Sequence, residues 1–437
     1  MKRKIFNDLR RWKENPKRMP LVLNGARQVG KTYILKKFAN ENYTNYAYVN
    51  LETNTSVNSF FEGDISPFKI IQYLETVCNE RIKPHKTLII LDEIQSCARA
   101  LLSLKNFCED APEYHVVAAG SLLGVAINPE KFSFPVGKVD ELTMFPLDFE
   151  EFLWAYNKDI LSNLIREHYV TFSPLTKAIH EQSIHCFKEY LIVGGMPAVV
   201  KEYVETGSFL SAADIQGKIL NEYIADMTKY ADNSTSVKIR GCYNSIPAQL
   251  AKENKKFQYK IVQKGATATI FGESIDWLIF AGIVLKCQKI DHGFIPISAY
   301  ADFSDFKLYM ADIGLLTLKS GMPQQMIIST IEPDNVFIGA MIENYVAQAL
   351  SCNSFPLYYW KNSNTAELDF VLQIGSDVIP VEVKKGKHTK SVSMNMFMKK
   401  YNSPYAIRIS QKNFGFENAI KSIPLYAVFC LNGSLGK

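Results

Sequence analysis

The feature that most constrains this chain is a glycine-rich motif of eight residues, GARQVGKT, at positions 25–32. A short apolar run precedes it and helical spacing follows it, so the sequence predicts a strand, a tight loop and a helix in succession. Backbone N–H groups of such a loop curl around a phosphate chain, and the positive end of the helix dipole strengthens the attraction. The predicted nucleotide-binding residues are Gly25, Ala26, Arg27, Gln28, Val29, Gly30, Lys31 and Thr32.

Two of these side chains have specific roles in that chemistry. Lys31 is expected to reach the β- and γ-phosphates, and the Thr32 hydroxyl is expected to bind Mg²⁺. An apolar strand at 88–91 then delivers Asp92 and Glu93 at its carboxyl end. Because two carboxylates are costly to bury without a metal or a partner, we expect Asp92 to hold Mg²⁺ and Glu93 to polarise the attacking water.

A third apolar strand, at 116–119, ends in Gly120 and Ser121. The Ser121 hydroxyl is expected to contact the γ-phosphate or to position water. Taken in order along the chain, the three strand ends predict an ATP site with Mg²⁺ as its cofactor. Its predicted catalytic residues are Lys31, Glu93 and Ser121, and its predicted metal ligands are Thr32 and Asp92.

Length and hydrophobic periodicity predict several domains. At roughly 100–200 residues per domain, a chain of 437 residues requires two to four of them. Apolar runs alternate with helical patterns in the first part, which is typical of a parallel α/β sheet with flanking helices. Later, three helix candidates with a break at Pro247 are followed by a strand, an order that suits a winged-helix module. We therefore expect an α/β multi-domain fold: a P-loop NTPase domain (1–150), a helical lid (151–234), a winged-helix-like module (235–298) and a further α/β domain (299–437).

The net charge of +5 conceals an uneven distribution. Residues 1–37 carry twelve Lys or Arg against two acids, and residues 235–290 carry nine against three. In the second region lysines surround a helix-turn-helix-like connection, and two interpretations of them stay level. Either they contact the phosphates of DNA without sequence specificity, or they are solvated residues of a lid or oligomer contact. These lysines are Lys252, Lys255, Lys256, Lys260 and Lys264.

The last region holds an acid–acid–lysine pattern. Asp369 is followed about one hairpin later by Glu382-Val383-Lys384, and strand alternation places Glu382 and Lys384 on the same side. With Glu343 on the preceding helix, this pattern resembles the PD-(D/E)XK superfamily of restriction-endonuclease-like proteins. The resemblance implies that Asp369 and Glu382 bind a second Mg²⁺ or Mn²⁺ and that Lys384 helps to activate water. The alternative is a same-face ion pair between Glu382 and Lys384, worth under about 1 kcal/mol if exposed.

Nearly the whole chain resembles a known family. GARQVGKT, LIILDEIQ, AAGSLLG and FPLDFEEFL follow one another as in bacterial and archaeal AAA+ type ATP-binding proteins whose C-terminal half is a domain of unknown function. YLIVGGMPAVV, KLYMADIGLL, GAMIENYVAQAL and ELDFVL…VEVKKG are similar to that family too. Similar proteins often carry Gly-Arg where this chain has Gly137-Lys138. Lys lacks the planar fork of an arginine finger, so the residue that would supply such a finger is not identified.

These patterns together predict an ATPase that couples ATP turnover to the binding or processing of nucleic acid through a nuclease-like C-terminal domain. The alternative is a nucleotide-dependent switch whose C-terminal domain binds a partner without catalysis. The start, MKRKIFNDLRRW, lacks the apolar core of a secretory signal, and no run of 18 apolar residues occurs, so we expect a cytoplasmic protein that engages no membrane. DNA and further copies of the chain remain open as partners beside ATP.

Overall fold

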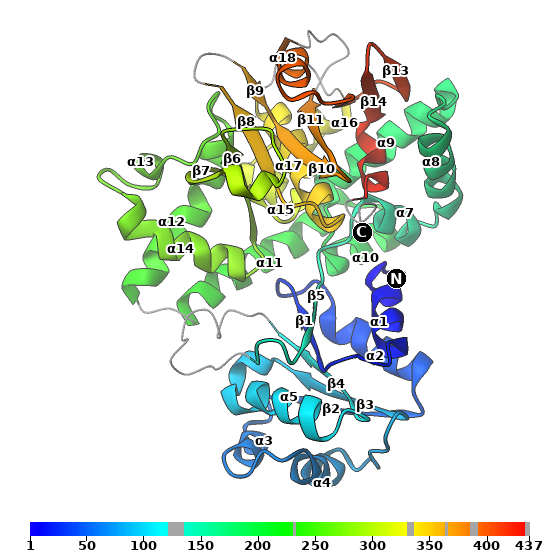
Figure 1. Ribbon diagram of the computed structural model, residues 1–437, viewed down its shortest axis with the longest axis vertical. Helices are drawn as coiled ribbons and strands as arrows, with labels where there is room; N and C mark the ends of the chain where they lie inside the picture. The colour runs from blue at the N-terminus through cyan, green and yellow to red at the C-terminus, as the bar shows by residue number, and fades with distance from the viewer. Residues whose placement is uncertain (121–134, 230–232, 330–335, 363–365, 385–391, 433–437) are drawn as a thin grey trace.

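The computed structural model describes residues 1–120, 135–229, 233–329, 336–362, 366–384 and 392–432. In Figure 1 the amino-terminal sheet lies at one end of the molecule and the carboxyl-terminal strands lie towards the other. Within the described ranges, no helix combines the length and the apolar character that crossing a membrane requires.

The amino-terminal region is a five-stranded parallel sheet with the order β2-β3-β4-β1-β5. Every residue of its strands β3 and β4 is buried, as expected for strands covered on both faces. This confirms the predicted parallel sheet with flanking helices, an arrangement that fits a P-loop NTPase. Its elements are β1 (Leu21–Asn24), β2 (Asn45–Asn50), β3 (Thr87–Asp92), β4 (His115–Ala119), β5 (Asp140–Thr143), α1 (Ile5–Glu14), α2 (Lys31–Asn42), α3 (Thr55–Asn58), η1 (Ser59–Phe61), α4 (Pro67–Cys78), η2 (Ile94–Ser96) and α5 (Ala98–Asp110).

The side chains of this sheet divide between two cores. Alternate residues such as Ile89 and Val116 pack with α4 and α5, whereas Ile90 and Val117 pack with α1 and α2. This two-residue alternation follows from strand geometry. Among the described residues, the second of these cores continues into the rest of the molecule, whereas the first lies between residues 22 and 139.

A helical region follows the sheet. A turn at Gly194–Pro197 separates two of its helices, and Pro197 occupies the first turn of the second, where its missing N–H costs nothing. The helices are α7 (Phe149–Ala155), α8 (Asp159–Thr171), α9 (Lys177–Val193), α10 (Pro197–Thr206) and α11 (Phe209–Lys229).

Three further helices and two antiparallel strands come next, in the order expected of a winged-helix module. They are α12 (Asn233–Leu250), α13 (Tyr259–Val262), α14 (Ala268–Phe280), β6 (Val284–Ile290) and β7 (Ala301–Met310), with η3 (Ile297–Tyr300) between the strands. The expected break at Pro247 is wrong, because Pro247 lies inside α12, where buried Ile246 and Leu250 on either side hold the helix in the core. β6 also pairs with β8 (Tyr358–Lys361), which pairs with β9 (Glu367–Leu368). The predicted boundary at 298/299 therefore falls within one four-stranded sheet, β7-β6-β8-β9.

A second five-stranded sheet, with the order β10-β11-β12-β14-β13, completes the carboxyl-terminal region. β11, β12 and β14 run parallel, and the outer strands β10 and β13 are antiparallel to their neighbours. Its strands are β10 (Phe370–Ile374), β11 (Asp377–Val383), β12 (Ala406–Ser410), β13 (Gly415–Glu417) and β14 (Ile420–Pro424). The helices around it are α15 (Ile313–Ser320), α16 (Gln324–Ser329), α17 (Val336–Cys352), α18 (Val392–Tyr401) and η4 (Leu425–Cys430).

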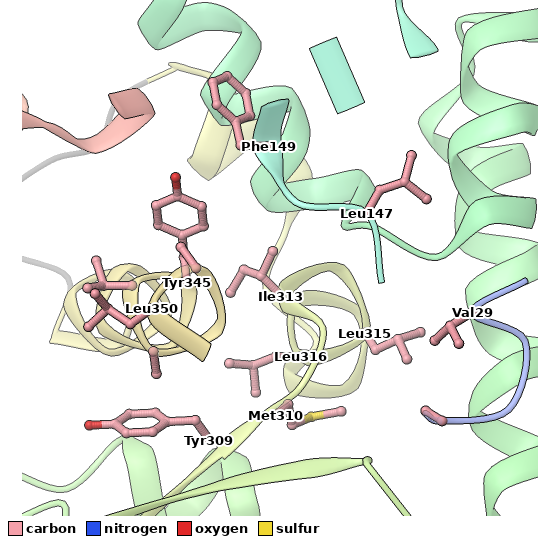
Figure 2. Close-up of a cluster of buried hydrophobic side chains, with 14 of the residues drawn as sticks. Val29, Leu147, Phe149, Tyr309, Met310, Ile313, Leu315, Leu316, Tyr345 and Leu350 are labelled. Carbon is pink, nitrogen blue, oxygen red and sulfur yellow. The ribbon is translucent and has the colours of Figure 1, made fainter. Parts of the chain in front are cut away.

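One continuous hydrophobic core joins the regions. Figure 2 shows part of it, with Val29 of the glycine-rich loop, Leu147, Leu315 of α15 and Tyr345 of α17 in a single cluster. All of these side chains are buried, at 2% exposure or less. The sheet that carries the glycine-rich loop is therefore packed directly onto the helical and carboxyl-terminal regions.

Candidate functional site

The glycine-rich loop between β1 and α2 takes a backbone path that requires its glycines. Gly25 and Gly30 have φ angles of 147° and 94°, where a side chain is strained. A Cβ at Gly25 would also lie 2.2 Å from the carbonyl oxygen of Met144. Helix α2 begins directly after the loop, at Lys31, so its free N–H groups face the loop.

Lys31 is folded back onto its own loop. Its Nζ donates hydrogen bonds to the carbonyl oxygens of Gly25 at 2.8 Å and Ala26 at 2.9 Å, and the residue is 8% exposed. Burial lowers the pKa of Lys31 to about 8, although Glu93 and Asp92 act in the opposite direction. The ammonium group is therefore desolvated and hydrogen-bonded to neutral carbonyl oxygens, which suits it to accept an anionic ligand.

Thr32 and Asp92 meet as the sequence predicts. The Thr32 hydroxyl donates to Asp92 Oδ2 at 2.7 Å, and the Tyr48 hydroxyl from β2 donates to the same oxygen at 3.0 Å. Asp92 is 2% exposed at the carboxyl end of β3. A carboxylate beside a hydroxyl is an oxygen donor set that fits Mg²⁺. Tyr48 was missed at the sequence level, because its place follows only from the pairing of β2 with β3.

Glu93 follows Asp92 in a left-handed conformation, with φ 53°. Its Oε2 accepts a hydrogen bond of 2.5 Å from the Nε2 of Gln95 in η2. Glu93 is also close enough to Lys31 to raise the pKa of that lysine against the effect of burial. Lys31, Thr32, Asp92 and Glu93 are therefore brought together at the carboxyl edge of the parallel sheet.

Helix α11 contacts the tip of the glycine-rich loop through an ion pair and hydrogen bonds. Arg27 pairs with Asp226 of α11 at 2.7 Å and with Glu52 at 3.2 Å. The Tyr223 hydroxyl donates to the Arg27 carbonyl oxygen at 3.2 Å, and Gln28 donates to Glu222. Burial raises the pKa of Asp226 to about 6, and Arg27 opposes that shift. The loop side chains predicted to bind nucleotide thus also connect the sheet to the helical region.

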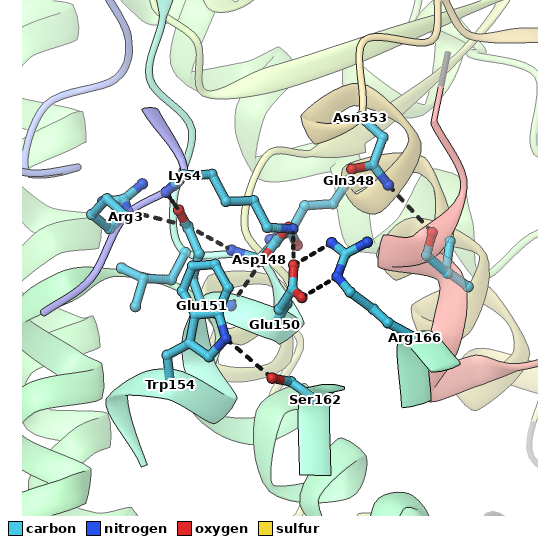
Figure 3. A network of polar contacts seen from close by, with 12 residues as sticks. Arg3, Lys4, Asp148, Glu150, Glu151, Trp154, Ser162, Arg166, Gln348 and Asn353 are labelled. Atoms are coloured by element: carbon cyan, nitrogen blue, oxygen red, sulfur yellow. Dashed lines mark hydrogen bonds and ion pairs between the residues drawn. The ribbon is translucent and has the colours of Figure 1, made fainter. Parts of the chain in front are cut away.

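The basic amino terminus is held by an acidic cluster at the start of α7 (Figure 3). Arg3 donates to Glu151 at 3.1 Å and to the Val29 carbonyl oxygen of the glycine-rich loop at 3.0 Å. Lys4 pairs with Glu150 at 2.7 Å and with Asp148. Part of the positive charge of residues 1–37 is therefore neutralised inside the protein.

Two residues considered at the sequence level remain. Ser121 lies outside the described residues. Lys138, at the position where an arginine finger was considered, pairs with Glu109 at 2.9 Å on the surface of its own domain.

In the carboxyl-terminal region, the Glu343 carboxylate is paired with two lysines, although Asp369 also lies nearby. Its Oε1 accepts from Lys307 of β7 at 3.2 Å and from the Tyr309 hydroxyl, and its Oε2 pairs with Lys255. Burial alone would raise the pKa of Glu343, but Lys255 and Lys307 outweigh it and hold the pKa at about 2. Lys307 is 1% exposed and also pairs with Glu367 at 2.7 Å.

Asp369 and Glu382 occupy two different settings. Asp369 Oδ2 accepts from the Val383 N–H at 2.8 Å, and burial, with Glu343 nearby, raises the pKa of Asp369 to about 7. Glu382 pairs with Lys384 at 2.5 Å. Over the part of the chain that the structure describes, no three His, Cys, Asp or Glu side chains gather so as to hold a metal ion.

The lysines predicted to face a polyanion are divided. Lys255 pairs with Glu343, and Lys256 pairs with Asp305 at 2.8 Å, so both face the carboxyl-terminal region. Lys252, Lys260 and Lys264 are exposed. Two lysines of the cluster therefore connect their own helical region to the carboxyl-terminal region, and the other three present charge to solvent.

Comparisons with known families divide the chain into three parts. A family model described as an AAA domain matches residues 17–153. Two domains of unknown function, DUF8612 and DUF4143, match residues 184–326 and 338–428. The amino-terminal domain is thus of the AAA type, in agreement with its sheet and glycine-rich loop. No curated protein matches the chain.

Solved structures with a similar course of the chain include three archaeal proteins. The Walker-type ATPase PABY2304 of Pyrococcus abyssi has a TM-score of 0.44 at 14% identity, covering 72% of this chain and 94% of that one. The ORC1 protein of Aeropyrum pernix, in complex with DNA, has a TM-score of 0.29 at 12% identity and coverages of 74% and 94%. Cdc6p from Pyrobaculum aerophilum has a TM-score of 0.24 at 11% identity and coverages of 74% and 91%.

Proposed function

We propose that this protein binds and hydrolyses ATP with Mg²⁺. The observation that carries the proposal is the bond of 2.7 Å between the Thr32 hydroxyl and Asp92, which joins the glycine-rich loop to the acidic end of β3. Lys31 and Glu93 complete a site in which a cation faces the phosphates and a carboxylate faces the attacking water. The match of residues 17–153 to an AAA domain supports the same activity.

A cavity of about 490 Å³ beside the loop offers a place for the nucleoside. It is lined by Gly30 and Tyr33 at the start of α2, by Met144, and by Pro197 and Ala198 at the start of α10. Apolar walls such as those formed by Met144, Pro197 and Ala198 suit a purine base, and Gly30 connects the cavity to the phosphate loop. We therefore place the base there.

In the proposed reaction, Lys31 turns from its loop carbonyl oxygens to the β- and γ-phosphates. Thr32 and Asp92 hold Mg²⁺, which supplies charge neutralisation at the phosphates when bound. Glu93 accepts a hydrogen bond from the attacking water and takes its proton. Tyr48 donates to Asp92 and keeps that carboxylate in place.

The test uses two substitutions with different expected results. Lys31→Ala should weaken Mg–ATP binding, because the phosphates lose their only buried loop cation. Glu93→Gln should leave binding intact and lower kcat by about 10²–10⁴-fold. Titration with a fluorescent ATP analogue and a phosphate-release assay measure the two effects. Lys37→Ala, on the same helix and paired with Glu41 at 3.8 Å, is the matched control. Unchanged binding and turnover in Lys31→Ala would contradict the assignment.

We further propose that the nucleotide state is coupled to the carboxyl-terminal region. Arg27 is bonded to α11, and Gly282, between α14 and β6, lies against Ala26 on the other side of the loop. A Cβ at Gly282 would lie 3.1 Å from the Ala26 nitrogen. A change in the shape of the glycine-rich loop on phosphate binding would therefore be transmitted to α11 and α14.

For the carboxyl-terminal domain, the contacts favour partner binding without cleavage over a nuclease. The order α17, β8, β9–β10, β11, α18, β12 supports a restriction-endonuclease-like fold. However, both oxygens of Glu343 are engaged by Lys255, Lys307 and Tyr309, so two cations already neutralise the carboxylate at the position where a metal would have to bind. Incubation of DNA with the protein and Mg²⁺ or Mn²⁺ tests this. Cleavage that Asp369→Ala or Lys384→Ala abolishes would restore the nuclease proposal.

DNA remains a candidate partner through the exposed lysines Lys252, Lys260 and Lys264. Their binding would be electrostatic, so it should weaken steeply with salt. ATP turnover measured with and without duplex DNA, at two salt concentrations, tests the link. Turnover that is indifferent to DNA would favour a protein partner.

A further inference from the structure

Gln95 is a buried polar residue that none of the roles above explains. It lies in η2, two residues after Glu93, and it is 5% exposed. Its Nε2 donates to Glu93, but its Oε1 is buried and has no hydrogen-bond partner among the residues that the structure describes. An amide oxygen buried without a donor costs free energy. Gln95 Oε1 therefore needs a hydrogen-bond donor that the described residues do not provide.

The chemistry of Glu93 determines which way the amide faces. An ionised carboxylate only accepts hydrogen bonds, so the NH₂ of Gln95 must face Glu93 and the oxygen must face away. The backbone supports this arrangement, because Glu93 is left-handed at φ 53° and its carbonyl oxygen accepts from the Ser96 N–H at 2.9 Å. Reversing the amide would set two oxygens against each other.

The unpartnered oxygen lies at the carboxyl edge of the sheet. Asp92 pairs in register with Ala119, so Gly120 stands next to Glu93 at the end of the neighbouring strand. A Cβ at Gly120 would lie 2.2 Å from Gln95 Oε1, and hence any larger residue would displace this oxygen. Ligands of open parallel sheets bind at this edge. The oxygen is thus directed to the side where the phosphates of ATP are expected.

We propose that Gln95 positions the attacking water. Its Oε1 accepts a hydrogen bond from this water, while its Nε2 holds the Glu93 carboxylate that takes the proton. Gln95 is then a positioning residue that fixes two partners of the reaction through one rigid amide. This inference rests on the proposed ATP hydrolysis and adds a residue to the same site.

The step balances without any further reactant. The water oxygen forms a bond to the γ-phosphorus, and the bond from the γ-phosphorus to the β–γ bridging oxygen breaks. ADP leaves with that electron pair, and the water proton passes to Glu93 and then to solvent or phosphate. The second O–H of the water points at Gln95 Oε1 throughout, so the amide is neither oxidised nor protonated.

Two variants of the full-length protein test the proposal. Gln95→Met keeps the length of the side chain and removes both polar atoms. It should lower kcat for Mg–ATP by about 10²-fold, a loss typical of removing one positioned hydrogen bond, with KM and analogue binding within about twofold of the parent. Ser96→Ala, in the same turn but exposed, is the matched control and should retain full turnover.

Gln95→Glu provides a readout that a purely structural role would not change. In this variant residue 95 and Glu93 can share one proton. The protonated acid at residue 95 then donates through its O–H and accepts through its carbonyl oxygen, as the amide does through its NH₂ and its oxygen. Because neighbouring carboxylates raise the pKa of the pair, turnover should approach that of the parent at low pH and fall as pH rises through this pKa. We expect the parent protein to show no such fall in turnover over the same pH range.

The outcomes separate this inference from the proposed function. If Glu93→Gln is inactive while Gln95→Met turns over ATP at the parental rate, only the role of Gln95 is overturned. If Glu93→Gln retains full hydrolysis, the assignment of the site itself fails. Should Gln95→Met fail to bind the analogue, the pH profile of Gln95→Glu decides, and a profile parallel to that of the parent would overturn the proposal.

Discussion

Asp312 shows how a single buried carboxyl group contributes to stability. It is 2% exposed, caps α15 by accepting from the Leu315 N–H at 2.9 Å, and accepts from the Gly195 N–H at 2.6 Å. Burial raises its pKa to about 6, and the N–H groups only partly oppose the shift. The folded protein therefore holds this proton more tightly than the unfolded chain does.

The sign of the pH dependence follows from that difference. A carboxyl group with a raised pKa in the folded state contributes stability that is present below its unfolded pKa, near 4, and that is lost as pH rises to about 6. We expect Asp312→Asn to remove this dependence, so its stability relative to the parent should improve between pH 4 and 6. Urea unfolding at several pH values measures it. Asp302→Asn is a control of opposite sign, because hydrogen bonds from Ser304 lower the pKa of Asp302.

At the scale of elements, the turn between α9 and α10 is the point where three regions touch. The Leu147 N–H donates to the Gly195 carbonyl oxygen at 2.7 Å, and the Gly195 N–H donates to Asp312 at the start of α15. Pro197, two residues on, lies beside Gly30 of the glycine-rich loop. The close approach depends on glycine, since a Cβ at Gly195 would lie 2.0 Å from the Leu147 carbonyl oxygen.

Gly195→Ala should therefore force these elements apart. We expect a loss of about 1–3 kcal/mol in the free energy of unfolding, as for other overpacked sites. Weaker Mg–ATP binding should accompany it, because α10 lines the cavity beside Gly30. Thermal unfolding and analogue titration provide the measurements. Gly217→Ala in α11, where an added Cβ meets nothing within 4 Å, should be neutral or slightly stabilising; an equal loss in both variants would contradict the steric explanation.

At the scale of the whole molecule, Lys307 connects regions that the sequence separates. It lies on β7 and pairs with Glu343 of α17 and Glu367 of β9, and its Nζ lies 4.6 Å from the centre of the Tyr359 ring of β8. Burial alone would lower its pKa, but Glu343, Glu367 and Asp369 outweigh that effect and raise it. The lysine is thus a permanent cation inside an acidic cluster.

Lys307→Met should destabilise the protein by about 3–5 kcal/mol, because Glu343 would keep its buried charge, and Glu367 its partly buried one, without this partner. Denaturant unfolding followed by far-UV circular dichroism measures the loss. Lys361→Met is the control: it pairs with the same Glu367 at 3.1 Å, but its side chain is 37% exposed, so it should cost under about 1 kcal/mol. Similar losses in the two variants would show that burial does not set the cost.

Much of the fold could be predicted from local pattern. The glycine-rich loop, the strands β1, β3 and β4 and the helix around Glu343 follow from periodicity and turn chemistry, which depend on neighbours in the sequence. Thr32 and Asp92 were predicted as Mg²⁺ ligands because Thr32 follows the Gly-Lys of the loop motif and Asp92 ends an apolar strand, where carboxylates are costly to bury without a metal or a partner. The break at Pro247 was wrong because tertiary packing of Ile246 and Leu250 overrode the helix-breaking tendency of proline.

The sequence by itself determined the chemistry of the nucleotide site, because G-x-x-x-x-G-K-T and a strand ending in Asp-Glu carry their spacing within short segments. Only the tertiary structure decided what surrounds that chemistry. Examples are the ion pair between Arg27 and Asp226, and the hydrogen bond from Gln95 to Glu93 at the edge beside Gly120. The pairing of Lys255 and Lys307 with Glu343 is another. Most of these contacts join residues far apart in the chain, and all depend on how strands and helices pack in three dimensions. Local periodicity carries no record of such packing.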